Sequence, residues 1–75
     1  MKGGRNTTKY PNIENERIKS RITKQSMAAK IGVSTYTLKS WQSGKSEIPA
    51  TKIVALAELF GVTTDYILGR TKTTP

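Results

Sequence analysis

Apolar residues recur three and four positions apart along most of this chain, and no stretch keeps the strict alternation of a β-strand. Such a spacing lines apolar side chains along one face of a helix. Residues typical of helix ends divide the pattern, so we expect short helices at about 13–21, 24–31, 35–43, 50–60 and 64–68. The predicted fold class is therefore all-α, a compact bundle of five helices.

Capping residues mark where these helices begin and end. We expect Asn12, Thr23 and Ser34 to begin the first three helices, because a side-chain oxygen there accepts a hydrogen bond from a free backbone N–H. Gly32 and Gly61 suit the left-handed residue that commonly follows the last turn of a helix. The connections between the helices are therefore short.

The apolar faces of the helices predict a single shared core. From the first helix and its end we expect the inner stripe to be Ile13, Ile18 and Ile22. The remaining predicted members are Met27, Ala28, Ile31, Leu38, Trp41, Ile53, Leu56, Ala57 and Phe60.

Polar ends flank the helical region. Residues 1–10 contain two adjacent glycines, three basic residues and almost nothing apolar, which predicts a flexible basic arm. Residues 70–75 should form a disordered tail. A chain of 75 residues leaves room for one domain only, which we place at 11–69.

The composition excludes several kinds of chemistry. Without Cys or His the chain has no ordinary zinc site, no thiol and no imidazole acid or base, so we expect no enzyme, no metal and no cofactor. The first residues lack the apolar part of a secretory signal, and the longest apolar run, 53–57, is too short to cross a bilayer. We therefore expect a cytoplasmic protein that does not span a membrane.

The net charge of the chain indicates what kind of partner it binds. The formal net charge is +8, and the segment 17–46 has seven Lys or Arg and none of the five acids. Such a one-sided surface attracts a polyanion, either a nucleic acid or an acidic membrane. The membrane interpretation needs a free apolar helix face, whereas the apolar faces here are required for the core.

The helix at 35–43 has two different sides. At 100° per residue, Leu38 and Trp41 fall together, whereas Tyr36, Ser40 and Ser43 fall roughly opposite them. One side is therefore anchored in the core. The other side presents hydroxyls and an aromatic ring, groups that can meet base edges and phosphates.

Four stretches between residues 22 and 69 carry a family resemblance: ITKQSMAAKIGVS, LKSWQSGK, LAELFGV and DYILG. In this order and spacing they resemble the Cro/cI-type helix-turn-helix regulators, also called the XRE family. The resemblance covers about residues 12–69, and the ending DYILGR is most like small phage repressor or Cro proteins. It implies a five-helix, lambda-repressor-like domain.

The resemblance also implies roles for individual residues. The helix at 35–43 would enter the major groove of DNA, with bases read by Thr35, Tyr36 and Ser40. Phosphate contacts would come from Lys24, Thr37, Lys39, Ser43 and Lys45. Lys2, Arg5 and Lys9 of the arm would contact the minor groove, or else form an ordinary charged chain end.

The sequence departs from the family pattern at two places. Family members often pair an Arg of the first helix with a Glu near the end of the third, but here Arg17 faces Gln42, so we expect a charged hydrogen bond in place of an ion pair. Ser26 stands where the second helix usually has an acid, and the third helix also lacks one in its first turn. DNA phosphate could take the place of these acids at the helix starts.

These observations favour a sequence-specific DNA-binding transcription regulator that works without catalysis, in a bacterial or phage-infected cell. We expect a double-stranded operator with an inverted repeat, bound by a homodimer. The dimer contact would consist of Tyr66, Ile67 and Leu68, unless Ile67 and Leu68 complete the core. If the tail is a truncated linker, a missing C-terminal domain would supply dimerisation instead. The alternative is an antitoxin-like or antirepressor-bound module of the same fold, whose main partner is another protein.

Overall fold

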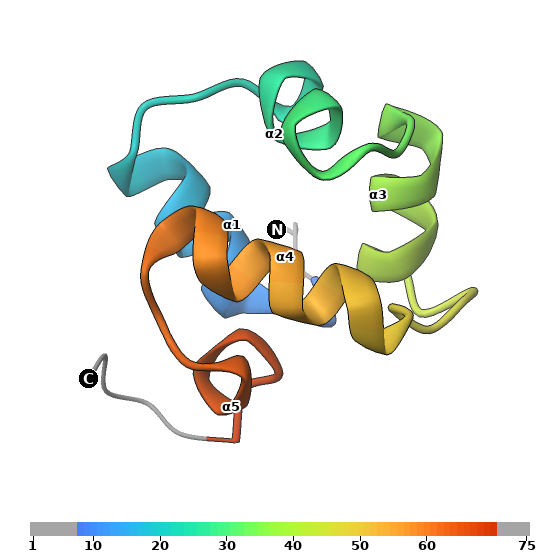
Figure 1. Ribbon diagram of the computed structural model, residues 1–75. Coiled ribbons are helices and arrows are strands. Elements are labelled where there is room, and N and C mark those ends of the chain that lie inside the picture. Colours follow the sequence, from blue (N-terminus) through green and yellow to red (C-terminus); the bar gives the residue numbers. More distant parts are fainter. Residues whose placement is uncertain (1–7, 71–75) are drawn as a thin grey trace, which may run out of the picture.

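The computed structural model describes residues 8–70, which form five helices and, within this range, no strand (Figure 1). The helices are α1 (Pro11–Lys19), α2 (Lys24–Ile31), α3 (Thr35–Gln42), α4 (Ala50–Phe60) and α5 (Thr64–Ile67). Every helix end lies within two residues of its expected place. The predicted all-α fold with five helices is confirmed.

The first helix begins earlier than its capping pattern predicts. Tyr10 occupies the N-cap position without a side-chain cap, and Pro11 is the first helical residue. Proline suits this position because it has no N–H to satisfy and its φ already matches a helix. Asn12 is therefore not the cap; its side-chain amide donates to the carbonyl of Tyr66, 2.7 Å away.

Hydroxyl side chains begin three of the other helices. Thr23 accepts a hydrogen bond from the N–H of Ser26 at 3.0 Å, and Ser34 accepts one from Thr37 at 3.1 Å, so both predicted caps are confirmed. Thr63 caps α5 in the same way. Each bond satisfies a backbone donor that the helix itself leaves free.

A left-handed glycine ends α2 and leads directly into α3. Gly32 has φ 77°, and the N–H of Val33 reaches back to the carbonyl of Ala28 at 2.9 Å. This bond pattern closes the last turn and reverses the chain within three residues. Gly61 ends α4 in the same conformation, as its position predicts.

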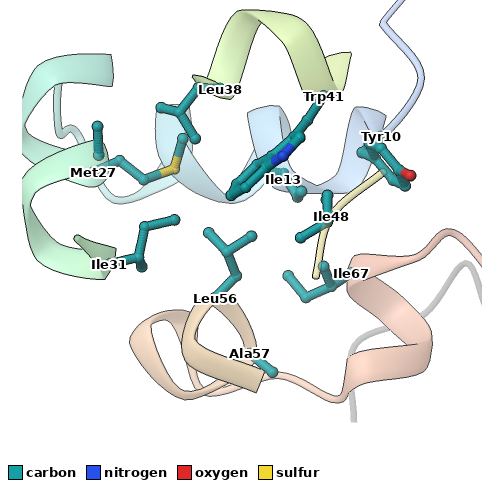
Figure 2. Close-up of a cluster of buried hydrophobic side chains, with 11 residues drawn as sticks. Tyr10, Ile13, Met27, Ile31, Leu38, Trp41, Ile48, Leu56, Ala57 and Ile67 are labelled. Carbon is teal, nitrogen blue, oxygen red and sulfur yellow. The ribbon is translucent and has the colours of Figure 1, made fainter. Parts of the chain in front are cut away.

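The core lies where all five helices meet (Figure 2). Its most buried side chains are Ile13, Leu56 and Ile67, contributed by α1, α4 and α5. Met27, Ile31, Leu38 and Trp41 come from α2 and α3, and the sequence did not identify Ile48 of the loop before α4. Ile53 and Phe60 are only partly buried against this cluster.

Ile18 is wrongly predicted to be a core residue. Its side chain is 59% exposed, whereas Ile13 is 2% exposed. Five residues on a helix turn the side chain by about 140°, so Ile18 faces away when Ile13 faces inward. Glu16 takes the inward position that the apolar pattern assigned to Ile18.

The predicted flexible arm, 1–10, is wrong at its last residue, because Tyr10 belongs to the folded domain. Its side chain is buried in the core, and Figure 2 shows the ring beside Ile48. The Gln42 amide holds its backbone, with Oε1 accepting from the Tyr10 N–H at 2.8 Å and Nε2 donating to the Tyr10 carbonyl at 3.1 Å. Folded structure therefore extends before residue 11. Lys2 and Arg5, and residues 71–75 of the predicted tail at 70–75, lie outside the described residues.

A buried polar contact joins α1 to α5. Glu16 is 5% exposed, and its carboxylate accepts a hydrogen bond from the Tyr66 hydroxyl at 3.0 Å. The same carboxylate forms an ion pair with Lys19 at 3.3 Å. Burial, followed by the hydrogen bond to Glu16, raises the pKa of Tyr66 above its ordinary value of 10.0.

The C-terminal helix does not offer the expected dimer contact. Tyr66 and Ile67 are 6% and 0% exposed, so both side chains belong to the core of their own domain, and Leu68 is partly buried against it. No helix among residues 8–70 has the length and apolar character needed to span a membrane.

Candidate nucleic-acid interface

The pair α2 and α3 forms one side of the molecule, supported from below by α4 (Figure 1). Lys52 of α4 donates a hydrogen bond to the carbonyl of Ile31 at 2.8 Å. A cation suits this place because the last carbonyls of a helix carry partial negative charge. This contact fixes the end of α2, and with it the turn into α3, relative to the rest of the fold.

The third helix has the two sides that its sequence predicts. Leu38 and Trp41 are 6% and 4% exposed and point into the core (Figure 2). Tyr36 is 72% exposed on the other side, and Thr35 is exposed beside it at the first position of the helix. Because the inner side is fixed by packing, the outer side is presented at a fixed angle.

A shallow depression of about 180 Å³ lies on this outer side of α3. Its lining consists of five residues, all of them predicted DNA contacts: Tyr36, Lys39, Ser40, Ser43 and Lys45. The structure therefore brings together residues that the family resemblance assigned separately to base and phosphate contacts.

The small hydroxyls near this depression already have partners. The Ser40 hydroxyl lies 3.0 Å from that of Ser46, and the Ser43 hydroxyl donates to the Ser40 carbonyl at 3.1 Å. The Thr37 hydroxyl lies 3.1 Å from that of the capping Ser34. Thr35 and Tyr36, by contrast, form no side-chain hydrogen bond with any described residue, so their polar groups remain available.

A larger groove, of about 780 Å³, runs beside α3 between α1 and the start of α2. Its floor is apolar and is made by Ile13, Met27, Leu38 and Trp41. The other lining residues are Thr8, Glu14, Ile18, Lys24, Thr35, Tyr36, Lys39 and Gln42. Lys24 and Lys39 therefore line the same groove, and Tyr36 and Lys39 line both this groove and the depression on the outer side of α3.

The basic side chains divide into paired and unpaired groups. Residues 8–70 contain ten Lys or Arg. Five contact an acid, a backbone carbonyl or an aromatic ring: Lys9, Arg17, Lys19, Lys52 and Arg70. Five are exposed and form no side-chain hydrogen bond or ion pair in this range: Arg21, Lys24, Lys30, Lys39 and Lys45. Exposed cations without a partner are the ones that phosphate oxygens can bind at least cost.

The predicted contact between Arg17 and Gln42 does not form. Arg17 binds both carboxylate oxygens of Glu14 and donates to the Ile22 carbonyl at 2.7 Å. The hydrogen bond from Arg17 lowers the pKa of Glu14 below its ordinary value of 4.5. Partial burial raises this pKa, but the positive charges of Arg17 and Lys24 lower it further, so the net shift is downward. Gln42 is occupied by Tyr10. A nearby acid therefore satisfies Arg17 in place of the acid missing from α3.

The helix starts keep the charge pattern expected from the sequence. Neither α2 nor α3 has an acid in its first turn, whereas α1 has Glu14 and α5 has Asp65. The first turn of α4 lacks an acid as well, so the feature is not limited to the motif. Within residues 8–70 no three side chains from His, Cys, Asp and Glu gather as metal ligands would.

Comparison with known families agrees with this arrangement. A family model described as helix-turn-helix matches residues 13–67, which is most of the chain. The chain belongs to the helix-turn-helix family. This helix-turn-helix domain is also 35% identical, over 51 residues, to an uncharacterised HTH-type transcriptional regulator of Bacillus subtilis, YobD. The aligned part is 68% of this chain and 46% of YobD, so the match spans about half of that relative.

The family confirms the main predictions made from the sequence. It is a family of DNA-binding regulator domains and not of enzymes, which agrees with the resemblance to XRE-type regulators. The helix-turn-helix of this domain consists of α2, the turn at 32–34 and α3.

Proposed function

We propose that this domain is a sequence-specific transcription regulator of the phage repressor or Cro type, which inserts α3 into the major groove of an operator. The observation that carries the proposal is the outer side of α3, where Tyr36 is 72% exposed while Leu38 and Trp41 hold the helix from behind. A helix fixed on one side and free on the other fits the width of the major groove.

Base reading is assigned to Thr35, Tyr36 and Ser40. Tyr36 is the strongest of the three, because its hydroxyl has no partner among the described residues and its ring can contact a thymine methyl group. Thr35 is exposed beside it. Ser40 shares its hydroxyl with Ser46, but a hydroxyl has one donor and two acceptor positions, so it can still meet a base.

Phosphate binding is assigned to the unpaired cations around α3. Lys24, at the start of α2, and Lys39 and Lys45, beside the depression, surround the reading surface. Thr37 and Ser43 are weaker anchors, because their hydroxyls already bond within the motif. Lys9 lies 5.6 Å from the centre of the Tyr10 ring and is the described member of the proposed arm contacts.

We further propose that two copies bind an inverted repeat as a homodimer. The longest dimension of the domain is 33 Å, close to the spacing of about 34 Å between half-sites one helical turn apart. One copy therefore covers one half-site, and two copies fit side by side. The regulator would act in the cytoplasm of a bacterial or phage-infected cell.

Selection of bound duplexes from random DNA tests this proposal. We expect enriched sites with two inverted half-sites about one helical turn apart. The control is a variant with Tyr36→Ala and Ser40→Ala, which should enrich a weaker or altered motif. A selection that enriches no sequence would overturn the proposal and would favour a domain whose main partner is a protein, such as an antirepressor.

A further inference from the structure

Arg21 lies in the connection between α1 and α2 and has an unusual backbone conformation. Its φ is 60°, and it is the one residue other than glycine with a positive φ in the part of the chain that the structure describes. The N–H of Arg21 donates a hydrogen bond to the carbonyl of Ile18 at 3.0 Å, and the N–H of Ile22 donates one to the carbonyl of Arg17 at 3.3 Å. These two bonds are the pair that normally requires a left-handed residue, usually glycine, after a helix.

An arginine in this position costs stability that a glycine would not. The Cβ of an L-residue crowds the backbone at positive φ, which is why such residues are uncommon outside Gly, Asn and Asp. The other left-handed positions after helices in this range are all glycines: Gly32, Gly44, Gly61 and Gly69. A strained residue is kept most easily where its side chain has a use.

The Arg21 side chain has no use within the described fold. It is exposed, and its guanidinium forms no hydrogen bond or ion pair with residues 8–70. Arg17, four residues earlier, is fully engaged by Glu14 and the Ile22 carbonyl. The planar guanidinium is the side chain best suited to binding phosphate through two hydrogen bonds.

The position of Arg21 relates it to the DNA-facing groove. Ile18, which accepts its backbone hydrogen bond, and Lys24, three residues after it, both line the groove beside α3. Figure 1 shows the connection running along the edge of the molecule into α2. Arg21 therefore lies between two residues that line the groove, Ile18 and Lys24, and adds an unpaired cation to the connection that leads into α2.

We infer that Arg21 binds a DNA phosphate, next to the one held by Lys24, and that its strained backbone is the cost of placing a guanidinium there. This inference rests on the proposed function and deepens it. It extends the contact with DNA from the recognition helix to the connection between α1 and α2, a position that family resemblance did not assign.

Three substitutions separate the side chain from the backbone strain. Arg21→Ala removes the guanidinium and keeps a Cβ, Arg21→Gly removes both, and Arg21→Lys keeps the charge. Lys30→Ala is the matched control, because Lys30 is an exposed and unpaired cation in the last turn of α2, at the opposite end from Lys24. Binding is measured to a random-sequence duplex of about 30 base pairs between about 50 and 200 mM salt, since phosphate contacts do not depend on sequence.

We expect Arg21→Ala and Arg21→Gly each to weaken binding about threefold to tenfold and to reduce the log–log salt slope by about 1 per bound protomer. Arg21→Lys should keep most of the affinity, and Lys30→Ala should bind like wild type. The melting temperature should rise by about 2–6 °C in Arg21→Gly only. Glycine would then improve folding while it impairs binding.

Wild-type affinity and salt slope in both Arg21→Ala and Arg21→Gly would overturn the inference and leave the proposed function intact. No rise in melting temperature for Arg21→Gly would overturn the stability cost assigned to Arg21. Failure of the wild-type domain to bind any duplex would overturn the proposed function, and the Arg21 contact with it.

Discussion

Replacing Tyr66 with Phe tests the buried contact between α1 and α5, because it removes one hydroxyl and keeps the ring. The hydroxyl lies 3.0 Å from the carboxylate of Glu16, a residue that is 5% exposed. Once the hydroxyl is gone, Lys19 is the one remaining partner of this carboxylate among residues 8–70. A hydrogen bond to a buried charged group contributes about 1.5–3 kcal/mol. For a domain of this size, that loss lowers the melting temperature by roughly 6–20 °C.

The assay is thermal unfolding followed by circular dichroism, with Tyr36→Phe as the matched control. Tyr36 is 72% exposed and its hydroxyl bonds to no described residue, so its loss should change stability by less than about 0.5 kcal/mol. Equal melting temperatures for Tyr66→Phe and wild type would refute the reasoning, because Glu16 would then need no hydroxyl donor.

Alkaline pH should act on the same contact. The pKa of Tyr66 is raised in the folded state, so the folded domain holds this proton more tightly than the unfolded chain does. The stabilisation that Tyr66 contributes is fully present below pH 10.0, the ordinary pKa of a tyrosine. It is lost as the pH rises through the raised pKa of Tyr66 in the folded domain. Tyr66→Phe should remove this part of the alkaline loss of stability.

The remaining predictions concern the core and the DNA contacts. Trp41→Ala should cost about 3–5 kcal/mol, because it empties a site that is 4% exposed; circular dichroism should find the domain largely unfolded, and a normal melting curve would contradict the assigned packing of α3. Lys24→Ala should weaken binding to operator and random DNA about equally. The wild-type affinity should fall with salt with a log–log slope that reflects about 4–8 phosphate contacts per dimer, and a flat response would contradict the groove model.

Local signals made most of the fold predictable. Thr23 and Ser34 cap their helices through their own side chains, and Gly32 ends α2 through its own backbone, so neighbouring residues suffice to locate these ends. The two sides of α3 follow from the spacing of Leu38 and Trp41 in the same way. These features depend on contacts a few residues apart, which a sequence contains directly.

Contacts between distant residues were not predictable in this way. Tyr10 looked like part of a polar arm because the amide that holds it, Gln42, is 32 residues away. The buried contact of Glu16 was not predicted, because its partner, Tyr66, lies 50 residues along the chain. The apolar period placed Ile18 inward, but α1 instead turns Glu16 inward, where its carboxylate accepts a buried hydrogen bond from Tyr66.

The candidate site was predictable in composition but not in detail. The acid-free segment 17–46 contains every unpaired cation of the described range, Arg21 included. The sequence does not reveal which cations are already paired, because Arg17 and Lys19 belong to the same segment and bind acids within α1. The sequence also does not reveal that the Ser40 hydroxyl bonds to Ser46 and the Thr37 hydroxyl to Ser34.

The most direct test of the central claim is whether the outer side of α3 reads sequence. The measurement is the ratio of affinities for the selected operator and for a random duplex, in wild type and in Tyr36→Ala, at one salt concentration. We predict that Tyr36→Ala loses about 1–3 kcal/mol of this discrimination while its binding to the random duplex changes little. An unchanged ratio, with both affinities reduced equally, would contradict the claim that Tyr36 contacts a base.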